Sequence, residues 1–325
     1  MSADSIEKIV RRLEELESQR VNSEYLLFAM DDVDDIYYGI DPNGNYVFVM
    51  VAANSSGRTS VQETSELVLV ASANCDLRIS GEIKNECVHI LVCKSRKLLD
   101  VFAFVRLTKA FISTADNNDG SISELFSSLV TLFSNRAEIS DASLQGLYAE
   151  MYFIWHSHLN GLELLPKWRT KGRMKYDFSI NETFKIEVKS SIGEMRIHHF
   201  SHEQIYANGL EIRIASFLLR QDDSGLSLDD LVERCRKLAG SNYGQLLLIE
   251  TATRGIEAET MSGLRYDEVY TIANIRAYYA NSLPHYECEQ PQGVSHTEYD
   301  ADLTMAPYQM IDELMGWVNE VDRGA

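Results

Sequence analysis

The sequence has no long hydrophobic run, since none approaches the roughly 18 apolar residues that a membrane-spanning helix needs. Its first residues, MSADSIEKIVRRLEELESQ, form a charged amphipathic pattern, which is not that of a signal peptide. The five cysteines are scattered and never spaced CxxC, which argues against a disulfide framework and a zinc knuckle. We therefore expect a protein of the reducing cytoplasm that has no membrane partner.

Positive charge is also scarce, because 30 Lys and Arg stand against 49 Asp and Glu, a net charge of −19. This balance argues against a protein that coats nucleic acid non-specifically. The deficit is uneven: residues 141–220 contain ten basic and nine acidic residues, so the rest of the chain carries −20. Within that window the segment KWRTKGRMK (167–175) has five basic residues and no acidic one.

The chain of 325 residues is long enough for two domains, and its composition of 45% hydrophobic and 24% charged residues is that of a globular protein. A helix is predicted to begin at Asp4 or Ser5. Residues 24–112 read as β-rich, with the apolar runs YVFVMVAA, ELVLVASA, CVHILVC and VFAFVRL separated by turn clusters. The segment FISTADNNDGS is the best linker, which predicts a β-rich N-terminal domain over 1–118 and a second domain over 119–325.

The second half alternates helices and strands. Helices are predicted over SISELFSSLVTLFSN, 141–158, SHEQIYAN, SLDDLVERCRKLA and the terminal PYQMIDELMGWV. Strands are predicted over EIRIASFLLR, GQLLLIETA and a pair around YDEVYTIANIRAYYA, in addition to a hairpin over 175–191.

That hairpin, KYDFSINETFKIEVKSS, carries the most informative pattern. Its apolar residues alternate with polar ones, and three residues join the two runs, a hairpin length. If Ile180 pairs with Phe184, Asp177 lies directly across from Glu187, with Lys189 on the same face. Facing carboxylates repel and destabilise a sheet, so this arrangement needs an explanation.

A divalent cation between the two carboxylates makes the arrangement favourable. Mg²⁺ usually takes one or two carboxylates and keeps waters that a phosphate can displace, and Mn²⁺ can substitute for it. The cation would polarise a phosphoryl oxygen and activate a water. Lys189 is expected to orient that water or to neutralise developing charge, and the carbonyl of Val188 is a further candidate ligand.

The preceding helix supplies a fourth candidate. Glu150 falls on or beside the apolar stripe that includes Leu147 and Ile154. A carboxylate turned toward the core is costly unless it is paired with a cation, so Glu150 is expected to point toward the sheet and to join the metal site. A hydrogen bond to a backbone amide is the alternative for this residue.

The order of these elements resembles the core of the PD-(D/E)xK nuclease superfamily. That order is a helix with an inward Glu, a strand with an Asp, a strand with ExK, a helix and a strand. More narrowly, GLYAEMYFI, YDFSI, FKIEVKSS and EQI resemble the PD-(D/E)XK motif proteins of prokaryotic restriction and anti-phage gene clusters. The resemblance covers about residues 143–220. It implies a restriction-endonuclease-like α/β core, a mixed sheet flanked by helices, behind the β-rich N-terminal domain.

The resemblance implies that Asp177, Glu187 and Lys189 are the acidic-acidic-basic signature and that Glu150 is the helix acid. Gln204 is similar to the glutamine that many relatives have beside the active site, although it also fits a surface polar residue. Tyr176 stands where the motif has a proline. The first strand of the core is not obvious, and LELL (162–165) is the best candidate.

The basic run is expected to contact nucleic acid, because Lys and Arg make sequence-independent phosphate contacts and Trp168 lies among them. The candidate residues are Lys167, Trp168, Arg169, Lys171, Arg173 and Lys175. A merely solvated loop is the alternative. The motifs WHSH (155–158) and HHFSH (198–202) do not present histidines on one face, which argues against zinc.

These observations predict a Mg²⁺-dependent DNA endonuclease of a prokaryotic restriction or anti-phage system. Its expected partners are DNA and proteins of the same gene cluster, such as an ATPase or a methyltransferase, and a homodimer is left open. The alternative is a catalytically inactive nuclease-fold scaffold whose acidic surface docks partners. For the hairpin itself, the alternative without a function is an exposed strand face with salt bridges.

Overall fold

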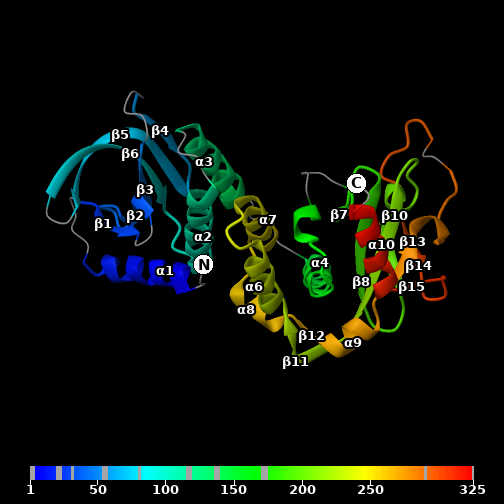
Figure 1. Ribbon diagram of the computed structural model, residues 1–325. Helices are drawn as coiled ribbons and strands as arrows, with labels where there is room; N and C mark the ends of the chain where they lie inside the picture. Colours follow the sequence, from blue (N-terminus) through cyan, green and yellow to red (C-terminus); the bar gives the residue numbers. More distant parts are fainter. Residues whose placement is uncertain are drawn as a thin grey trace. The chain divides into compact units, whose positions relative to one another are not determined.

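A computed structural model describes the chain over residues 4–19, 24–30, 33–52, 58–79, 82–114, 119–134, 140–169, 175–288 and 291–323 (Figure 1). The chain forms two compact units, one of residues 1–137 and 239–254 and the other of 138–238 and 255–325. No helix within the described ranges is long and apolar enough to cross a bilayer.

The first unit contains one antiparallel sheet in the order β1-β2-β3-β6-β5-β4 (Figure 1). Its strands are β1 Leu26–Met30, β2 Val33–Ile40, β3 Tyr46–Val51, β4 Ser60–Glu63, β5 Leu67–Ile79 and β6 Glu82–Cys93. One face buries alternate apolar side chains of β2, β3 and β6, including Val47, Val49 and Ile90, so the period of two sets the sheet. The predicted β-rich N-terminal region is confirmed.

The described residues of this unit form four helices: α1 Asp4–Glu17, α2 Leu98–Thr114, α3 Asp119–Ser134 and α7 Tyr243–Thr253. Helix α1 confirms the predicted N-terminal helix and buries Ile9, Val10 and Leu13. The run VFAFVRL, predicted as a strand, lies inside α2. This assignment was wrong because VFAFVRL is apolar apart from Arg106, and a short run of that kind fits a buried helix as well as a strand.

The segment GQLLLIETA was also predicted as a strand and instead lies in α7. Its N-cap Asn242 accepts a hydrogen bond from the Gln245 N–H at 3.0 Å. Arg106 of α2 pairs with buried Glu250 of α7 at 2.7 Å, and Arg254 pairs with Asp100. These ion pairs attach α7 to the first unit. Since α3 also packs on α2, this unit extends past the boundary predicted at 118/119.

The second unit is built on a mixed sheet in the order β15-β13-β10-β8-β7. Strands β8 and β10 are parallel, and the other neighbours are antiparallel. The sheet strands are β7 Phe178–Ser179, β8 Phe184–Ile192, β10 Glu211–Leu219, β13 Arg276–Tyr279 and β15 Gln309–Met310. This is the predicted α/β core, a mixed sheet flanked by helices.

Two short sheets and the helices complete this unit. The short sheets pair β9 Ile197–Ser201 with β14 Glu298–Asp302, and β11 Gln221–Ser227 with β12 Arg265–Tyr266. The helices are α4 Asp141–Leu159, α5 His202–Ile205, α6 Leu228–Ala239, α8 Ala258–Gly263, α9 Glu268–Ala273 and α10 Ile311–Arg323, with 3-10 turns η1 Leu165–Lys167 and η2 Ala280–Ser282.

The predicted helix 141–158, strand EIRIASFLLR, helix SLDDLVERCRKLA and terminal helix correspond to α4, β10, α6 and α10. Two predictions were wrong. The candidate first strand LELL leads into η1, and the predicted strand pair around YDEVYTIANIRAYYA contains α9 between two short strands. In the second case Asp267 accepts from the Tyr270 N–H at 2.9 Å, a helix N-cap that overrides the β-branched and aromatic composition.

The two faces of the main sheet are covered differently. Gln145 of α4 donates to Ser190 of β8 at 3.0 Å, and Trp317 of α10 packs on Phe184, so the even-numbered residues of β8 face these two helices. The odd-numbered residues of β8 therefore lie on the opposite face. The core there contains Phe200, Ile205, Ile212 and Ile214, among others.

Candidate active site

The loop between β7 and β8 is closed by one asparagine. The Asn181 side chain accepts from the N–H groups of Thr183 and Phe184, each at 3.0 Å. The Ile180 N–H donates to the Phe184 carbonyl at 3.0 Å, which is the pairing that the sequence predicts. The turn chemistry of the loop thus fixes the register of the hairpin.

This register brings the two acidic residues together. Phe178 pairs with Ile186, so Asp177 stands opposite Glu187. A further ladder bond would join residues 176 and 188, but the Val188 N–H donates to Asp177 Oδ2 at 2.8 Å instead. The strands therefore separate at Asp177, whose carboxylate replaces a backbone acceptor. The Val188 carbonyl points to the same edge as its N–H.

Glu187 is buried, with 3% of its surface exposed, and its two oxygens have different environments. Oε1 accepts from Lys189 Nζ at 2.8 Å and from Gln204 Nε2 at 2.5 Å. Oε2 is buried, and no described residue forms a hydrogen bond with it. A buried carboxylate oxygen without a donor is costly, so this atom is a ready ligand for a cation.

Burial disfavours the ionised form of both acidic residues. Desolvation raises the pKa of Glu187 to about 7, although the ammonium of Lys189 works against this shift. Desolvation also raises the pKa of Asp177 well above its ordinary range, and the negative charges of Glu187 and Glu150 add to the rise. Carboxylates that resist ionisation without a cation are typical of metal-binding and catalytic sites.

Gln204 connects the site to α5. Its Oε1 accepts from Lys189 Nζ at 3.2 Å and from the Ser201 N–H at 3.1 Å, while its Nε2 donates to Glu187. Lys189 is further held 5.1 Å above the ring of Phe200. The structure thus brings together Asp177, Glu187, Lys189 and Gln204, all of which the sequence predicted as site residues.

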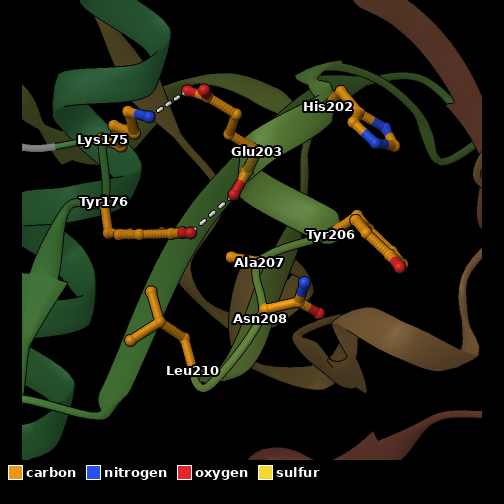
Figure 2. Close-up of a pocket in the computed structure, with 8 residues that line it drawn as sticks. All are labelled: Lys175, Tyr176, His202, Glu203, Tyr206, Ala207, Asn208 and Leu210. Atoms are coloured by element: carbon orange, nitrogen blue, oxygen red, sulfur yellow. Dashed lines mark hydrogen bonds and ion pairs between the residues drawn. The ribbon is translucent and has the colours of Figure 1, made fainter. Parts of the chain in front are cut away.

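A cavity of about 310 Å³ is lined by residues that neighbour Asp177 and Gln204 in the sequence (Figure 2). The Tyr176 hydroxyl donates to the Glu203 carbonyl at 2.6 Å, and Lys175 pairs with the Glu203 carboxylate, as Figure 2 shows. These contacts hold α5, and with it Gln204, against the segment that carries Asp177. The cavity is lined by Lys175, Tyr176, His202, Glu203, Tyr206, Ala207, Asn208 and Leu210.

Glu150, which the sequence predicts to join the metal site, has hydrogen-bond partners of its own. It is buried, and its Oε2 accepts from Trp168 Nε1 at 2.6 Å and from Arg169 Nε at 2.9 Å. Its Oε1 accepts from Arg169 Nη2 at 2.8 Å. The cation that compensates this inward carboxylate therefore belongs to the chain itself. Among the described residues, no group of three or more His, Cys, Asp or Glu side chains is arranged to hold a metal ion.

The basic run divides between buried and exposed residues. Trp168 is fully buried, so it cannot stack on a bound nucleotide, and its assignment as a nucleic-acid contact is corrected. Lys167 donates to the Ile180 carbonyl at 3.1 Å and pairs with Asp322 at 2.7 Å. Arg169 and Lys175 stay partly exposed. Lys171 and Arg173 lie outside the described residues.

The roles of Trp168 and Arg169 as partners of Glu150 were missed from sequence. A tryptophan inside a polar, basic run was itself a signal, because a large aromatic residue is usually well buried. An inward Glu eighteen residues earlier needed a donor, and an adjacent indole and guanidinium supply three N–H groups.

The histidines are held apart by separate partners. His198 is buried and bonds the Ser216 hydroxyl at 2.7 Å, and burial lowers its pKa to about 3. His199 is exposed between Asp300 and Glu298, and His202 bonds the Cys288 carbonyl at 2.7 Å. No two of these three contact the same group.

Comparison with known families agrees with this geometry. Residues 6–304 match the model of the family described as "Putative PD-(D/E)XK family member, (DUF4420)", and the chain belongs to this family. No curated protein and no solved structure matches the chain. The family assignment covers the first unit as well as the PD-(D/E)XK-like core.

Proposed function

We propose that the chain is a Mg²⁺-dependent endonuclease that hydrolyses phosphodiester bonds in DNA. The observation that carries the proposal is the buried Oε2 of Glu187, which has no hydrogen-bond partner among the described residues. Glu187 stands opposite Asp177 in the hairpin. Membership of the PD-(D/E)XK family points to nuclease chemistry. Mn²⁺ is expected to substitute for Mg²⁺.

The residues present fit a hard divalent cation. Asp177 and Glu187 would hold it, with the Val188 carbonyl as a third oxygen donor, which matches the one or two carboxylates that Mg²⁺ usually takes. When bound, the cation supplies Lewis-acid polarisation of the phosphate and lowers the pKa of a bound water.

The other side chains of the site are proposed to orient the attacking water and to neutralise charge on the phosphate. Lys189 provides a compact ammonium beside the carboxylate pair, where it can orient the attacking water and balance charge that develops on the phosphate. Gln204 holds both Lys189 and Glu187 through its amide, so it is assigned a positioning role. These groups are preorganised by hydrogen bonds before substrate arrives.

The first prediction concerns metal binding. Mg²⁺ or Mn²⁺ should raise the melting temperature, because a ligand bound only by the folded state stabilises it by about 2.7 kcal/mol at a hundred times its Kd. Glu187→Gln should abolish this shift, whereas Glu182→Gln in the exposed hairpin loop should not. Equal shifts in wild type and Glu187→Gln, measured by differential scanning calorimetry, would remove the hairpin from consideration as a metal site.

The second prediction tests the reaction. Purified protein should convert supercoiled plasmid to nicked or linear forms with Mg²⁺ or Mn²⁺ and not with EDTA. Asp177→Asn and Glu187→Gln should each be inactive, because each removes a carboxylate of the pair. A wild-type protein that leaves plasmid intact with either metal, also with its natural partners present, would contradict the nuclease proposal.

We further propose that the enzyme acts in the cytoplasm within a prokaryotic restriction or anti-phage system, on the strength of the motif resemblance. Residues outside 141–220 carry −20, which suits docking to a basic partner or to an ATPase or methyltransferase of the same gene cluster. The same acidic surface favours the second candidate function, a scaffold that has lost catalysis. Cleavage assays decide between the two.

A further inference from the structure

Arg169 is held in an unusual way at the edge of β7. Its backbone has a φ of 42°, in the left-handed region that a non-glycine residue rarely adopts. Its N–H donates to the Asp177 carbonyl at 2.9 Å, and its guanidinium makes two bonds to Glu150. The adjacent Trp168 lies beneath the guanidinium, 5.1 Å from it, and bonds the same carboxylate. The two bonds to Glu150 and the contact with Trp168 thus fix the side chain, and the bond to Asp177 fixes the backbone.

The guanidinium also lies within electrostatic range of the site and is partly exposed to solvent. It interacts electrostatically with the carboxylates of Asp177 and Glu187 as well as with Glu150. The Arg169 side chain is 45% exposed, whereas that of Glu150 is 8% exposed. The bonds to Glu150 use two of the five N–H donors of the guanidinium, and no other described side chain accepts from the rest.

We propose that Arg169 binds the phosphate group at the cleavage site and that Glu150 is a positioning residue for Arg169, not a metal ligand. The inference rests on the proposed nuclease function. It changes the role of Glu150 from metal ligand to a residue that positions Arg169. A phosphate that approaches Asp177 and Glu187 meets negative charge, and a prepositioned guanidinium offsets this repulsion with fork-shaped hydrogen bonding.

Four variants separate this role from a structural ion pair. Glu150→Gln keeps the shape of the side chain and removes its charge, and Arg169→Met removes the cation. The double variant Glu150→Gln/Arg169→Met leaves no unpaired buried charge, so its melting temperature should recover relative to Arg169→Met alone. The matched control is Arg106→Met/Glu250→Gln, which removes a buried ion pair of the first unit.

Three measurements apply to each variant: the Mn²⁺-induced melting shift, the salt dependence of duplex DNA binding in Ca²⁺, and plasmid cleavage in Mg²⁺. We expect Glu150→Gln to keep the Mn²⁺ shift. Arg169→Met should reduce the slope of log K against log salt by about one phosphate contact. It should also slow cleavage by about 10²–10³-fold, and the double variant should recover stability without recovering cleavage. The control pair should retain all three properties.

Two results would overturn the inference. One is loss of the Mn²⁺ shift in Glu150→Gln as in Glu187→Gln, which would make Glu150 a metal ligand. The other is wild-type DNA binding and cleavage by the double variant, which would make the pair purely structural. If the wild-type protein cleaves nothing, the proposed function fails on its own, while the Mn²⁺ shift and the salt slope still decide the roles of Glu150 and Arg169.

Discussion

Replacing Lys189 with methionine should slow metal-dependent DNA cleavage by about 10²–10⁴-fold, the range for removal of a positioned catalytic group. The ammonium lies 2.8 Å from Glu187 Oε1, next to the oxygen assigned to the cation. Its charge is needed most when negative charge grows on the phosphate. Single-turnover cleavage of plasmid at saturating Mg²⁺ measures this loss. At high pH, metal binding measured by the Mn²⁺ melting shift should persist because Asp177 and Glu187 remain.

Weaker metal binding could also slow cleavage by Lys189→Met, and this effect must be separated from the loss of a catalytic group. Lys189 lowers the pKa of Glu187, so its removal should raise that pKa further and weaken metal binding near neutrality. Raising the pH to about 9 should then restore metal binding in Lys189→Met but not cleavage. Recovery of full activity at high pH would show that Lys189 only keeps Glu187 ionised.

Arginine is an informative replacement at the same position. Lys189→Arg keeps the charge, but a planar guanidinium cannot fit between Glu187 and Gln204, which lie 2.8 and 3.2 Å from the ammonium. It should restore little cleavage. Cell protection by Lys189→Met equal to that of wild type in a phage challenge would support the scaffold function instead.

The core of the candidate site was predictable from sequence because hairpin rules are local. A three-residue loop and strict alternation are enough to set Asp177 opposite Glu187, and Asn181 in the loop reinforces the same register. Lys189 follows by the period of two. No distant part of the chain is needed for these three positions.

The position of Glu150 followed from helix periodicity, but its partner did not. The indole and guanidinium that bind it come from a turn in which Arg169 adopts a positive φ. No periodic pattern in the sequence predicts such a conformation. The inference that Glu150 needed a cation was sound. The identity of that cation depended on tertiary placement.

The same limit explains the misassigned segments of the fold. VFAFVRL and GQLLLIETA are short apolar runs, which suit a buried strand and a buried helix equally. The second lies in α7 because its ends are fixed by the Asn242 cap and by ion pairs to α2, far away in sequence. Local pattern sets the hairpin, whereas long-range pairing sets these helices.

The pH dependence of stability offers the sharpest test of whether Glu187 belongs to a metal site. Its pKa rises from an ordinary 4.5 to about 7 in the folded chain, so between these values the folded state keeps a proton that the unfolded state has lost. Stability without metal should therefore fall as pH rises through this window. The loss is about 3 kcal/mol for a shift of this size, and it is complete above pH about 7.

Glu187→Gln should remove this loss, because a neutral amide has no proton to release. Relative to wild type, the free energy of unfolding of Glu187→Gln should rise by at least about 3 kcal/mol between pH 4.5 and pH 8 without metal, because the variant also removes the charge that helps to raise the pKa of Asp177. The comparison is needed because buried His198, whose pKa is lowered to about 3, gives wild type and variant alike a stability that increases with pH below 6.5. Urea unfolding of both proteins across this range gives the difference directly.

With Mg²⁺, wild type should become more stable than Glu187→Gln above pH 7. Above pH 7 the ionised pair binds the cation and wild type gains stability that Glu187→Gln cannot gain. If the ion pair between Glu187 and Lys189 outweighed desolvation, the comparison would run in the opposite way, since the carboxyl pKa would be lowered and wild type would be the more stable protein at pH 8 with or without metal. A variant that is less stable than wild type at pH 8 in EDTA, and by the same margin with Mg²⁺, would therefore show that the ion pair with Lys189 dominates and that no cation binds at Glu187.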